Sequence, residues 1–350
     1  MPMKRALPSR GSHGMPNFLD GDKMNDKKLR VAVVGVGYLG RFHAEKYGRM
    51  PDVDLIGVAD VDSAQATSVA AATHTRAYAD YRDLIGRVDA VSIAAPTPAH
   101  YEISRTFLEN NVDVLIEKPI TTRLEEADEL IAIAEGRGLI IQVGHLERFN
   151  SAVVALKGIV NQPRFIESHR LSIYKNRCTD VSVVLDLMIH DIDIIGNFVG
   201  SKLKQVHAAG IPVITSQVDI ANARLAFENG CVANVTASRI STHNQRKIRL
   251  FQSDAYISVD FAKHEISIIR KNGERPDAII PGMEINQLCF TKGDALEDEL
   301  KSFVKAVQGR AQPEVTGKMG RDALSIALNI MDQIRDNGDA LHRDQGPLGQ

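Results

Sequence analysis

The chain has 350 residues, of which 44% are apolar and 25% are charged, and its formal net charge is −2. This length favours two globular domains, and a near-neutral charge with scattered basic residues argues against a nucleic-acid partner, which needs a clustered basic surface. No apolar run approaches the roughly 20 residues of a membrane-spanning helix, so we expect no membrane insertion.

The cysteines and the first residues bear on the cellular compartment. Cys178, Cys231 and Cys289 are far apart and odd in number, which fits neither a disulfide framework nor a CxxC metal site and implies a reducing compartment. Residues 1–28 are rich in Pro, Gly, Ser and charge and lack the apolar middle of a secretory signal. We therefore expect a cytoplasmic chain in which 1–28 is a disordered extension or tag.

Residues 29–146 alternate short apolar runs with amphipathic stretches, which is typical of parallel strands buried between helices. This segment predicts an α/β Rossmann domain. Its expected strands are residues 30–34, 55–59, 90–94, 112–116 and 139–143, and a helix is expected over 122–136.

A GxGxxG motif at residues 35–40 follows the first expected strand and opens a helix. Gly35 can make the tight turn, Gly37 lets the backbone approach a pyrophosphate, and Gly40 lets helix and strand pack closely. The unpaired amide groups at the helix start, which includes Tyr38 and Leu39, then face the anion. The motif therefore predicts a dinucleotide site.

Asp60 lies twenty positions after Gly40, at the end of the second expected strand. A carboxylate at this place accepts hydrogen bonds from ribose hydroxyls and repels a 2′-phosphate, and Asp62 adds to the repulsion. The sequence therefore predicts NAD rather than NADP as the cofactor. In the alternative interpretation, the glycines only make a tight turn and Asp60 caps the next helix.

Two further segments follow buried strands, where ligands bind in an open parallel sheet. One is residues 94–100, which include Thr97 and His100, and the other is Glu117-Lys118-Pro119. Lys118 could exchange a proton with a carbinol oxygen, and its charge could stabilise a developing alkoxide. The alternative is an ordinary solvated lysine at a strand end.

From residue 147 to residue 336 the expected strands alternate apolar and polar residues, which predicts an α+β domain with a large, mostly antiparallel, open-faced sheet. Glu228-Asn229-Gly230 indicates a hairpin turn between two of these strands. Thr316 is expected to cap the last helix. The expected strands include 220–227, 247–251 and 265–269, the last helices are 294–308 and 318–335, and a tail covers 337–350.

Residues 184–195, wound as a helix, place Asp186, His190, Asp193 and Asn197 on one polar stripe. A carboxylate one turn from His190 can orient the ring and raise its basicity, so that His190 carries a proton near neutral pH. The wet side of an amphipathic helix would give the same pattern. A metal site is less well supported, because no third ligand lies on the same element.

The glycine motif, the Glu117-Lys118-Pro119 step and the pair Asp186 and His190, in this order and spacing, resemble the Gfo/Idh/MocA oxidoreductases over about residues 29–335. The resemblance implies a two-domain subunit whose open-faced second sheet packs against another subunit, in a homodimer or homotetramer. In many members the Lys-Pro bond is cis. One departure is that many members carry glycines ahead of the Asp, where this chain has Val183-Val184-Leu185.

The same resemblance implies roles for individual residues. Lys118 and His190 become the catalytic pair, with Asp186 as the carboxylate that orients them. Three further residues, namely Thr97, His100 and Glu117, then lie near the nicotinamide and its ribose.

A finer resemblance is carried by residues 144–150 and 185–191, which look like those of bacterial UDP-N-acetylglucosamine 3-dehydrogenases of lipid A biosynthesis. It implies that Arg148 and Asn150 lie in the sugar pocket. Arg177 is a candidate for the diphosphate, because a planar guanidinium binds phosphate oxygens in pairs. Each of the three would also fit a surface or interdomain ion pair.

Together these features predict an NAD-dependent dehydrogenase that oxidises a secondary hydroxyl on a sugar ring, with Lys118 or His190 as the base. The finer resemblance implies that the substrate is a nucleotide sugar, oxidised at C3 of UDP-N-acetylglucosamine. A dehydrogenase or reductase of a free sugar, an inositol or another small carbonyl compound would not need Arg148 or Arg177 for affinity. A non-catalytic dinucleotide sensor is the third possibility, although it would have no use for Lys118, Asp186 and His190.

Overall fold

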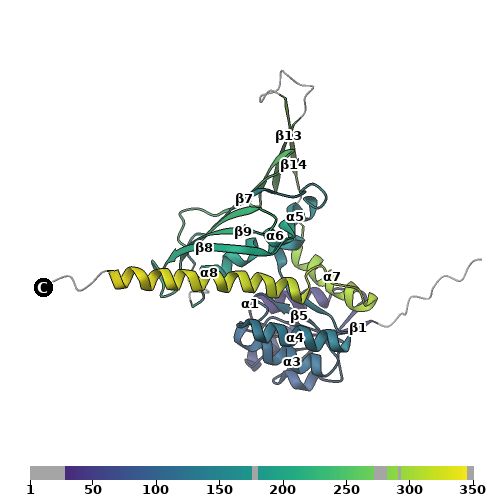
Figure 1. Cartoon of the computed structure of the whole chain (residues 1–350). Helices are drawn as coiled ribbons and strands as arrows, with labels where there is room; N and C mark the ends of the chain where they lie inside the picture. Colours follow the sequence, from purple (N-terminus) through teal and green to yellow (C-terminus); the bar gives the residue numbers. More distant parts are fainter. Residues whose placement is uncertain (1–27, 176–179, 272–281, 291–292, 345–350) are drawn as a thin grey trace, which may run out of the picture.

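The computed structural model describes residues 28–175, 180–271, 282–290 and 293–344. It contains a six-stranded and an eight-stranded sheet, and the long helix α8 (Gly317–Asp344) runs between them (Figure 1). Among the helices of these ranges, none is long and apolar enough to cross a membrane.

The first sheet is parallel throughout and has the order β3-β2-β1-β4-β5-β6. The strand order reverses beside β1, so the ends of β1 and β4 form the crevice in which doubly wound sheets bind ligands. This confirms the Rossmann arrangement, although the short edge strand β3 was not expected. The strands are β1 (Leu29–Val34), β2 (Val53–Ala59), β3 (Arg76–Tyr78), β4 (Ala90–Ile93), β5 (Asp113–Glu117) and β6 (Ile141–Gly144).

Helices cover both faces of this sheet. One core joins β4 and β5 to α3 (His100–Glu109) and α4 (Leu124–Arg137), and the other joins β1 to α1 (Tyr38–Tyr47) and α2 (Ser63–Ala72). The helix expected over 122–136 is therefore confirmed as α4. It ends at Gly138, whose φ of 64° suits a residue without a side chain.

The second sheet has the order β14-β13-β12-β11-β7-β10-β9-β8, and only β7 and β10 pair in parallel. Buried and more exposed residues alternate along β9, β11 and β12, so one face packs on α5 (Ser151–Ala155), α6 (Ile189–Val199) and α8 while the other stays open. The mostly antiparallel sheet and its hairpin at Gly230 are confirmed. The strands are β7 (Phe165–Leu171), β8 (Leu203–Ile211), β9 (Ile220–Phe227), β10 (Val232–Ser238), β11 (Gln245–Phe251), β12 (Ala255–Asp260), β13 (Glu265–Lys271) and β14 (Met283–Cys289).

The last two helices pack on more than the sheet that precedes them. Phe303 of α7 (Ala295–Gly309) lies in the core around β1 and α1. In α8, Leu324 packs in the core of β4 and β5, whereas Ile330 packs under the second sheet. Helices that follow the expected boundary at residue 146 therefore pack on the first sheet as well as on the second. Helical periodicity shows that a helix face is apolar but not which sheet that face will cover. The expected cap is confirmed, since Thr316 Oγ1 accepts the Met319 N–H at 3.2 Å.

Candidate active site

The glycine motif forms the turn between β1 and α1. Gly35 has a φ of 81°, and a Cβ on it would lie 2.4 Å from the Ala95 nitrogen, while a Cβ on Gly40 would lie 1.8 Å from the Gly35 oxygen. A Cβ on Gly37, by contrast, would meet no atom within 4 Å. Gly37 is the N-cap of α1 and makes no side-chain cap hydrogen bond, so the start of this helix lies beside the space that Gly37 leaves open. This cradle fits a dinucleotide pyrophosphate.

Asp60 ties the end of β2 to the glycine turn. Its carboxylate accepts the Val36 N–H at 2.7 Å and the Asp62 N–H at 2.9 Å. The cap of α2 is Asp62, which accepts the N–H groups of Ala64 and Gln65, so the alternative interpretation of Asp60 as that cap is wrong. The contact of Asp60 with a ribose stays a prediction.

Lys118 brings the two halves of the chain together. Its ammonium group donates to the backbone oxygen of Asp186 at 2.8 Å and lies 3.7 Å from the Asp186 carboxylate. Its side chain is 19% exposed, which contradicts the alternative of a freely solvated lysine. The Lys118-Pro119 bond is cis, as the family resemblance implied.

His190 does not pair with Asp186 in the expected way. Residues Val184–Met188 form a π-helical turn before α6, which breaks the spacing of four residues on which the stripe depended. Within the described ranges no hydrogen bond joins the two side chains, and the Asp186 carboxylate faces Lys118 instead. Burial, with the charges of Lys118 and Arg170, holds the pKa of His190 well below its usual value. The expectation of raised basicity is therefore wrong, and the ring is neutral at neutral pH.

The other strand-end residues hold the loops together. The two ring nitrogens of His100 lie 2.9 Å from the Pro119 oxygen and 2.8 Å from the Ala95 oxygen, so the buried imidazole bridges the segments after β4 and β5. Thr97 lies partly exposed on the first of these segments. Roles of Thr97 and His100 at the nicotinamide stay predictions.

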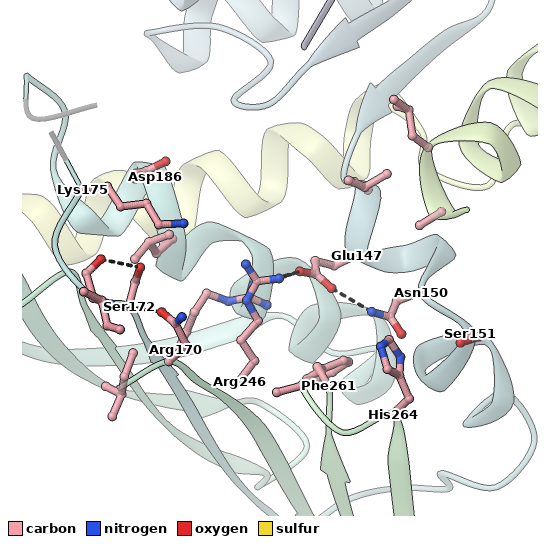
Figure 2. A pocket seen from close by; sticks show the side chains of 18 of the residues that line it. Glu147, Asn150, Ser151, Arg170, Ser172, Lys175, Asp186, Arg246, Phe261 and His264 are labelled. Carbon is pink, nitrogen blue, oxygen red and sulfur yellow. Dashed lines mark hydrogen bonds and ion pairs between the residues drawn. The ribbon is translucent and has the colours of Figure 1, made fainter. Parts of the chain in front are cut away.

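A cavity of about 930 Å³ opens beside Asp186 (Figure 2). Its wall comes from η3 (Leu146–Phe149), β7, β11 and the segment before α7, which are far apart in the sequence. Its wall carries the side chains of Arg170, Lys175, Arg239 and Arg246 and the carboxylates of Glu147, Asp186 and Asp294. Lys175 and Arg246 are exposed, so they are the cationic partners that the cavity offers to an anionic ligand near Lys118.

Two of these arginines face each other across adjacent strands, since Arg170 of β7 pairs in register with Arg246 of β11. Glu147 lies between them, 2.9 Å from Arg170 and 3.3 Å from Arg246, and Asp191 binds Arg170 at 2.8 Å. The Arg170 side chain is 4% exposed and fully engaged, whereas that of Arg246 is 55% exposed. Neither arginine was predictable as part of a site, because cross-strand register is not visible in a single sequence.

The expected sugar-pocket residues have different outcomes. Asn150 lines the cavity, where it donates to Glu147 and accepts the Ala152 N–H as the cap of α5. Arg148 is only 2% exposed and faces Asp193 at 3.8 Å and Met319 at 3.5 Å, so the expectation that it lines the pocket is wrong. The turn of η3 directs it inward, away from the cavity. Arg177 lies outside the described residues.

The remaining stripe residues also differ from expectation. Asp193 is buried beside Arg148, while Asn197 is exposed, so the two do not share one wet helix face. Within the described part of the chain no group of three or more His, Cys, Asp or Glu side chains is arranged to hold a metal ion.

Known protein families and relatives match both halves of the chain. A family model described as an oxidoreductase family with an NAD-binding Rossmann fold matches residues 29–145, and the GFO/IDH/MocA C-terminal domain model matches residues 152–258. The UDP-N-acetylglucosamine 3-dehydrogenase of Acidithiobacillus ferrooxidans is 38% identical over 304 residues, which are 86% of this chain and 96% of that protein. The chain belongs to the Gfo/Idh/MocA oxidoreductase family.

The similarity extends to the fold and to further relatives. A solved structure of the Acidithiobacillus ferrooxidans enzyme superposes with a TM-score of 0.82 at 35% identity, covering 88% of this chain and 98% of that one. The myo-inositol 2-dehydrogenase of Thermotoga maritima is 25% identical over 320 residues, which are 85% of this chain and 94% of that protein. As a Gfo/Idh/MocA member the chain is an oxidoreductase that uses NAD, and the open cradle at Gly37 fits that cofactor.

Proposed function

We propose that this chain oxidises the C3 hydroxyl of UDP-N-acetylglucosamine to the 3-keto sugar, with NAD+ as the hydride acceptor. The observation that carries the proposal is the cationic cavity beside Asp186, with Lys175 and Arg246 on its wall. A nucleotide sugar brings a diphosphate that these exposed side chains can bind, whereas a free sugar or inositol has no anionic group for them. The 38% identical relative named for this activity supports the same assignment.

The bound cofactor supplies the hydride chemistry, and the residues of this chain supply position and a path for the proton. In the proposed mechanism the neutral His190 imidazole accepts the proton of the sugar hydroxyl, since its lowered pKa leaves it unprotonated at neutral pH. The Lys118 ammonium group stabilises the charge that develops on the oxygen. Asp186, by its contacts with Lys118, holds that group in place.

The open face of the second sheet suggests how subunits associate. We infer that it packs against the same sheet of another copy in a homodimer or homotetramer, as the family resemblance implied. The partly exposed rings of Phe165, Phe251 and Tyr256, which contact one another on this face, support the inference. Since NAD and UDP-sugars are cytoplasmic metabolites, the proposed location is the cytoplasm.

The test is NADH formation by the purified chain with UDP-N-acetylglucosamine, free N-acetylglucosamine and myo-inositol. We expect the highest kcat/KM with the UDP-sugar, and mass spectrometry of the product should show the loss of two hydrogens at C3. Comparable turnover of the free sugar or the inositol would contradict the proposal. No hydride transfer to NAD+ from any of the three would favour a sensor.

A pair of arginine variants tests the cavity. Arg246→Ala should lower kcat/KM for the UDP-sugar by roughly 10- to 100-fold, mainly through KM, because a charge-assisted contact to phosphate is lost. Arg105→Ala is the control, since Arg105 lies on α3, pairs with Glu109 and is not part of the cavity wall. Equal effects of the two substitutions would count against a diphosphate at Arg246.

A further inference from the structure

A line of buried polar side chains runs through the first core to Glu117. The Tyr47 hydroxyl lies 3.1 Å from the Ser92 hydroxyl, which lies 3.1 Å from Nδ1 of His43, and Nε2 of His43 lies 3.2 Å from the Glu117 carboxylate. Tyr47, Ser92 and His43 have no exposed surface, and Glu117 is 8% exposed. Polar groups buried so deeply are costly unless they satisfy one another, so Tyr47, Ser92 and His43 constrain each other. Nε2 of His43 lies at ion-pair distance from Glu117 and makes no hydrogen bond within the described residues.

The negative charge of the Glu117 carboxylate favours one arrangement of protons along this line. A proton on Nε2 of His43 suits its contact with Glu117, so Nδ1 must accept from Ser92. The Ser92 oxygen then accepts from the Tyr47 hydroxyl, which keeps its proton because burial raises the pKa of Tyr47. In the opposite direction, the lone pair of Nε2 would face the negative carboxylate.

Glu117 in turn fixes the backbone that presents Lys118. Its second carboxylate oxygen accepts the Lys118 N–H at 3.3 Å. On the other side it lies against β6, where a Cβ on Gly144 would come within 2.8 Å of the carboxyl carbon. One residue beyond Lys118, the Pro119 oxygen lies 2.9 Å from His100. The segment that carries the lysine is therefore held by a buried histidine at each end.

The position of His43 gives this arrangement a functional meaning. His43 lies on α1, one turn after Gly40 of the glycine motif, while Ser92 lies on β4 and Glu117 ends β5. The line thus connects the helix behind the dinucleotide cradle with the segment that presents the lysine. A displacement of about 1 Å at a reacting group can lower a rate about 100-fold, so rigid support here has kinetic value.

We propose that His43, oriented by Ser92 and Tyr47, is a positioning residue that fixes Glu117 and through it the Lys118 segment, linking cofactor binding to the placement of the catalytic amine. The inference rests on the role of Lys118 in the proposed function, but not on the identity of the sugar.

A matched pair of serine variants tests the line. Ser92→Ala removes the hydroxyl that orients His43 and should lower kcat about tenfold, with KM for the sugar changed by less than about twofold. Ser104→Ala on α3 is the control, because Ser104 is equally buried and its hydroxyl has no hydrogen-bond partner in the described part of the chain. Equal kcat values for the two variants and the wild type would overturn the proposal.

Substitutions of His43 separate positioning from packing. His43→Gln places an amide donor near the position of Nε2 and should keep kcat within about tenfold of the wild type. The amide of His43→Asn reaches only the position of Nδ1, so the kcat of this variant should fall about 100-fold. If His43 only fills space, the two variants should have equal kcat, or the longer Gln should have the lower kcat. Any difference should then follow the thermal stability of the variants, which is measured together with kcat.

Hydrogen exchange gives a readout that does not depend on the substrate. In Ser92→Ala and His43→Asn the peptide that contains residues 113–121 should exchange faster, while peptides of the second sheet and the Ser104→Ala protein should match the wild type. Unchanged exchange of 113–121 would overturn the positioning role even if UDP-N-acetylglucosamine proved not to be the substrate. Conversely, faster exchange without turnover of this sugar would reject only the proposed function.

Discussion

Lys118 and His190 come from different halves of the chain, and the charge of Lys118 affects the pKa of His190. Burial is the largest cause of the lowered pKa of His190, and the positive charge of Lys118 is the next. Burial alone disfavours an imidazolium, and a neighbouring ammonium group disfavours it further. The pair therefore consists of a fixed cation and a neutral proton acceptor, which suits oxidation of an alcohol.

The pH behaviour of His190 follows from these two causes. Because its folded pKa is lowered, the ring stays neutral down through the ordinary histidine value of about 6.5, and kcat/KM should fall only at lower pH. In Lys118→Met the pKa of His190 should rise part of the way back, since burial remains, whereas Lys118→Arg keeps the charge and should leave it low. An NMR titration of the imidazole checks this, and titration of wild-type His190 at or above 6.5 would contradict it.

Residue types at these positions were predictable, but their partners were not. The order of Lys118, Asp186 and His190 along the chain suggested a shared site, and the structure brings Lys118 and Asp186 into contact. That Asp186 serves the lysine and not the histidine depends on a π-helical turn, which residue spacing does not predict. The predicted place of Arg148 was wrong for a similar reason, because the direction of its side chain is set by how η3 packs on α6 and α8.

At the scale of elements, the glycine turn is the part that the sequence predicted best. A GxGxxG motif encodes backbone shape directly, so the separate demands on Gly35, Gly37 and Gly40 were available before the fold. The cavity wall was not predictable from the sequence. Strand register places β7 beside β11, and tertiary packing brings the segment before α7 to them. Elements fixed by local sterics are predictable from one chain, whereas surfaces assembled from distant strands are not.

Alanine at two of these glycines should therefore have opposite effects. Gly37→Ala puts a methyl group where the protein has no atom within 4 Å, so the melting temperature should change little while the Kd for NAD+ rises at least about tenfold. Gly40→Ala forces a Cβ against the Gly35 oxygen and should lower the melting temperature or prevent folding. Thermal melts and NADH fluorescence titrations measure both quantities.

Gly136→Ala is the matched control for this pair. Gly136 lies inside α4 and a Cβ on it would meet no atom within 4 Å, so alanine should stabilise the protein by roughly 0.5–1 kcal/mol without altering NAD+ binding. If Gly37→Ala bound NAD+ as tightly as Gly136→Ala, the cradle would not be where the pyrophosphate binds.

At the scale of the whole molecule, the two sheets share their last helices. α7 completes the core around β1 and α1, and α8 runs between the two sheets (Figure 1). Its Leu324 packs against the first sheet and its Ile330 against the second. Neither sheet can lose these helices without exposing buried apolar surface. The molecule should therefore unfold as one cooperative unit, although its two sheets have separate cores.

Two tryptophan reporters test this cooperativity, because the chain has no tryptophan of its own. Tyr81→Trp reports on the core of β4 and β5, and Tyr256→Trp reports on the second sheet. In each background Leu324→Ala should cost about 2–5 kcal/mol and lower both urea midpoints together, since α8 couples the sheets. Arg335→Ala, on an exposed part of α8, should move neither by much. If Leu324→Ala lowered only the Tyr81→Trp midpoint, the sheets would be independent units, and α8 would be a tether between them.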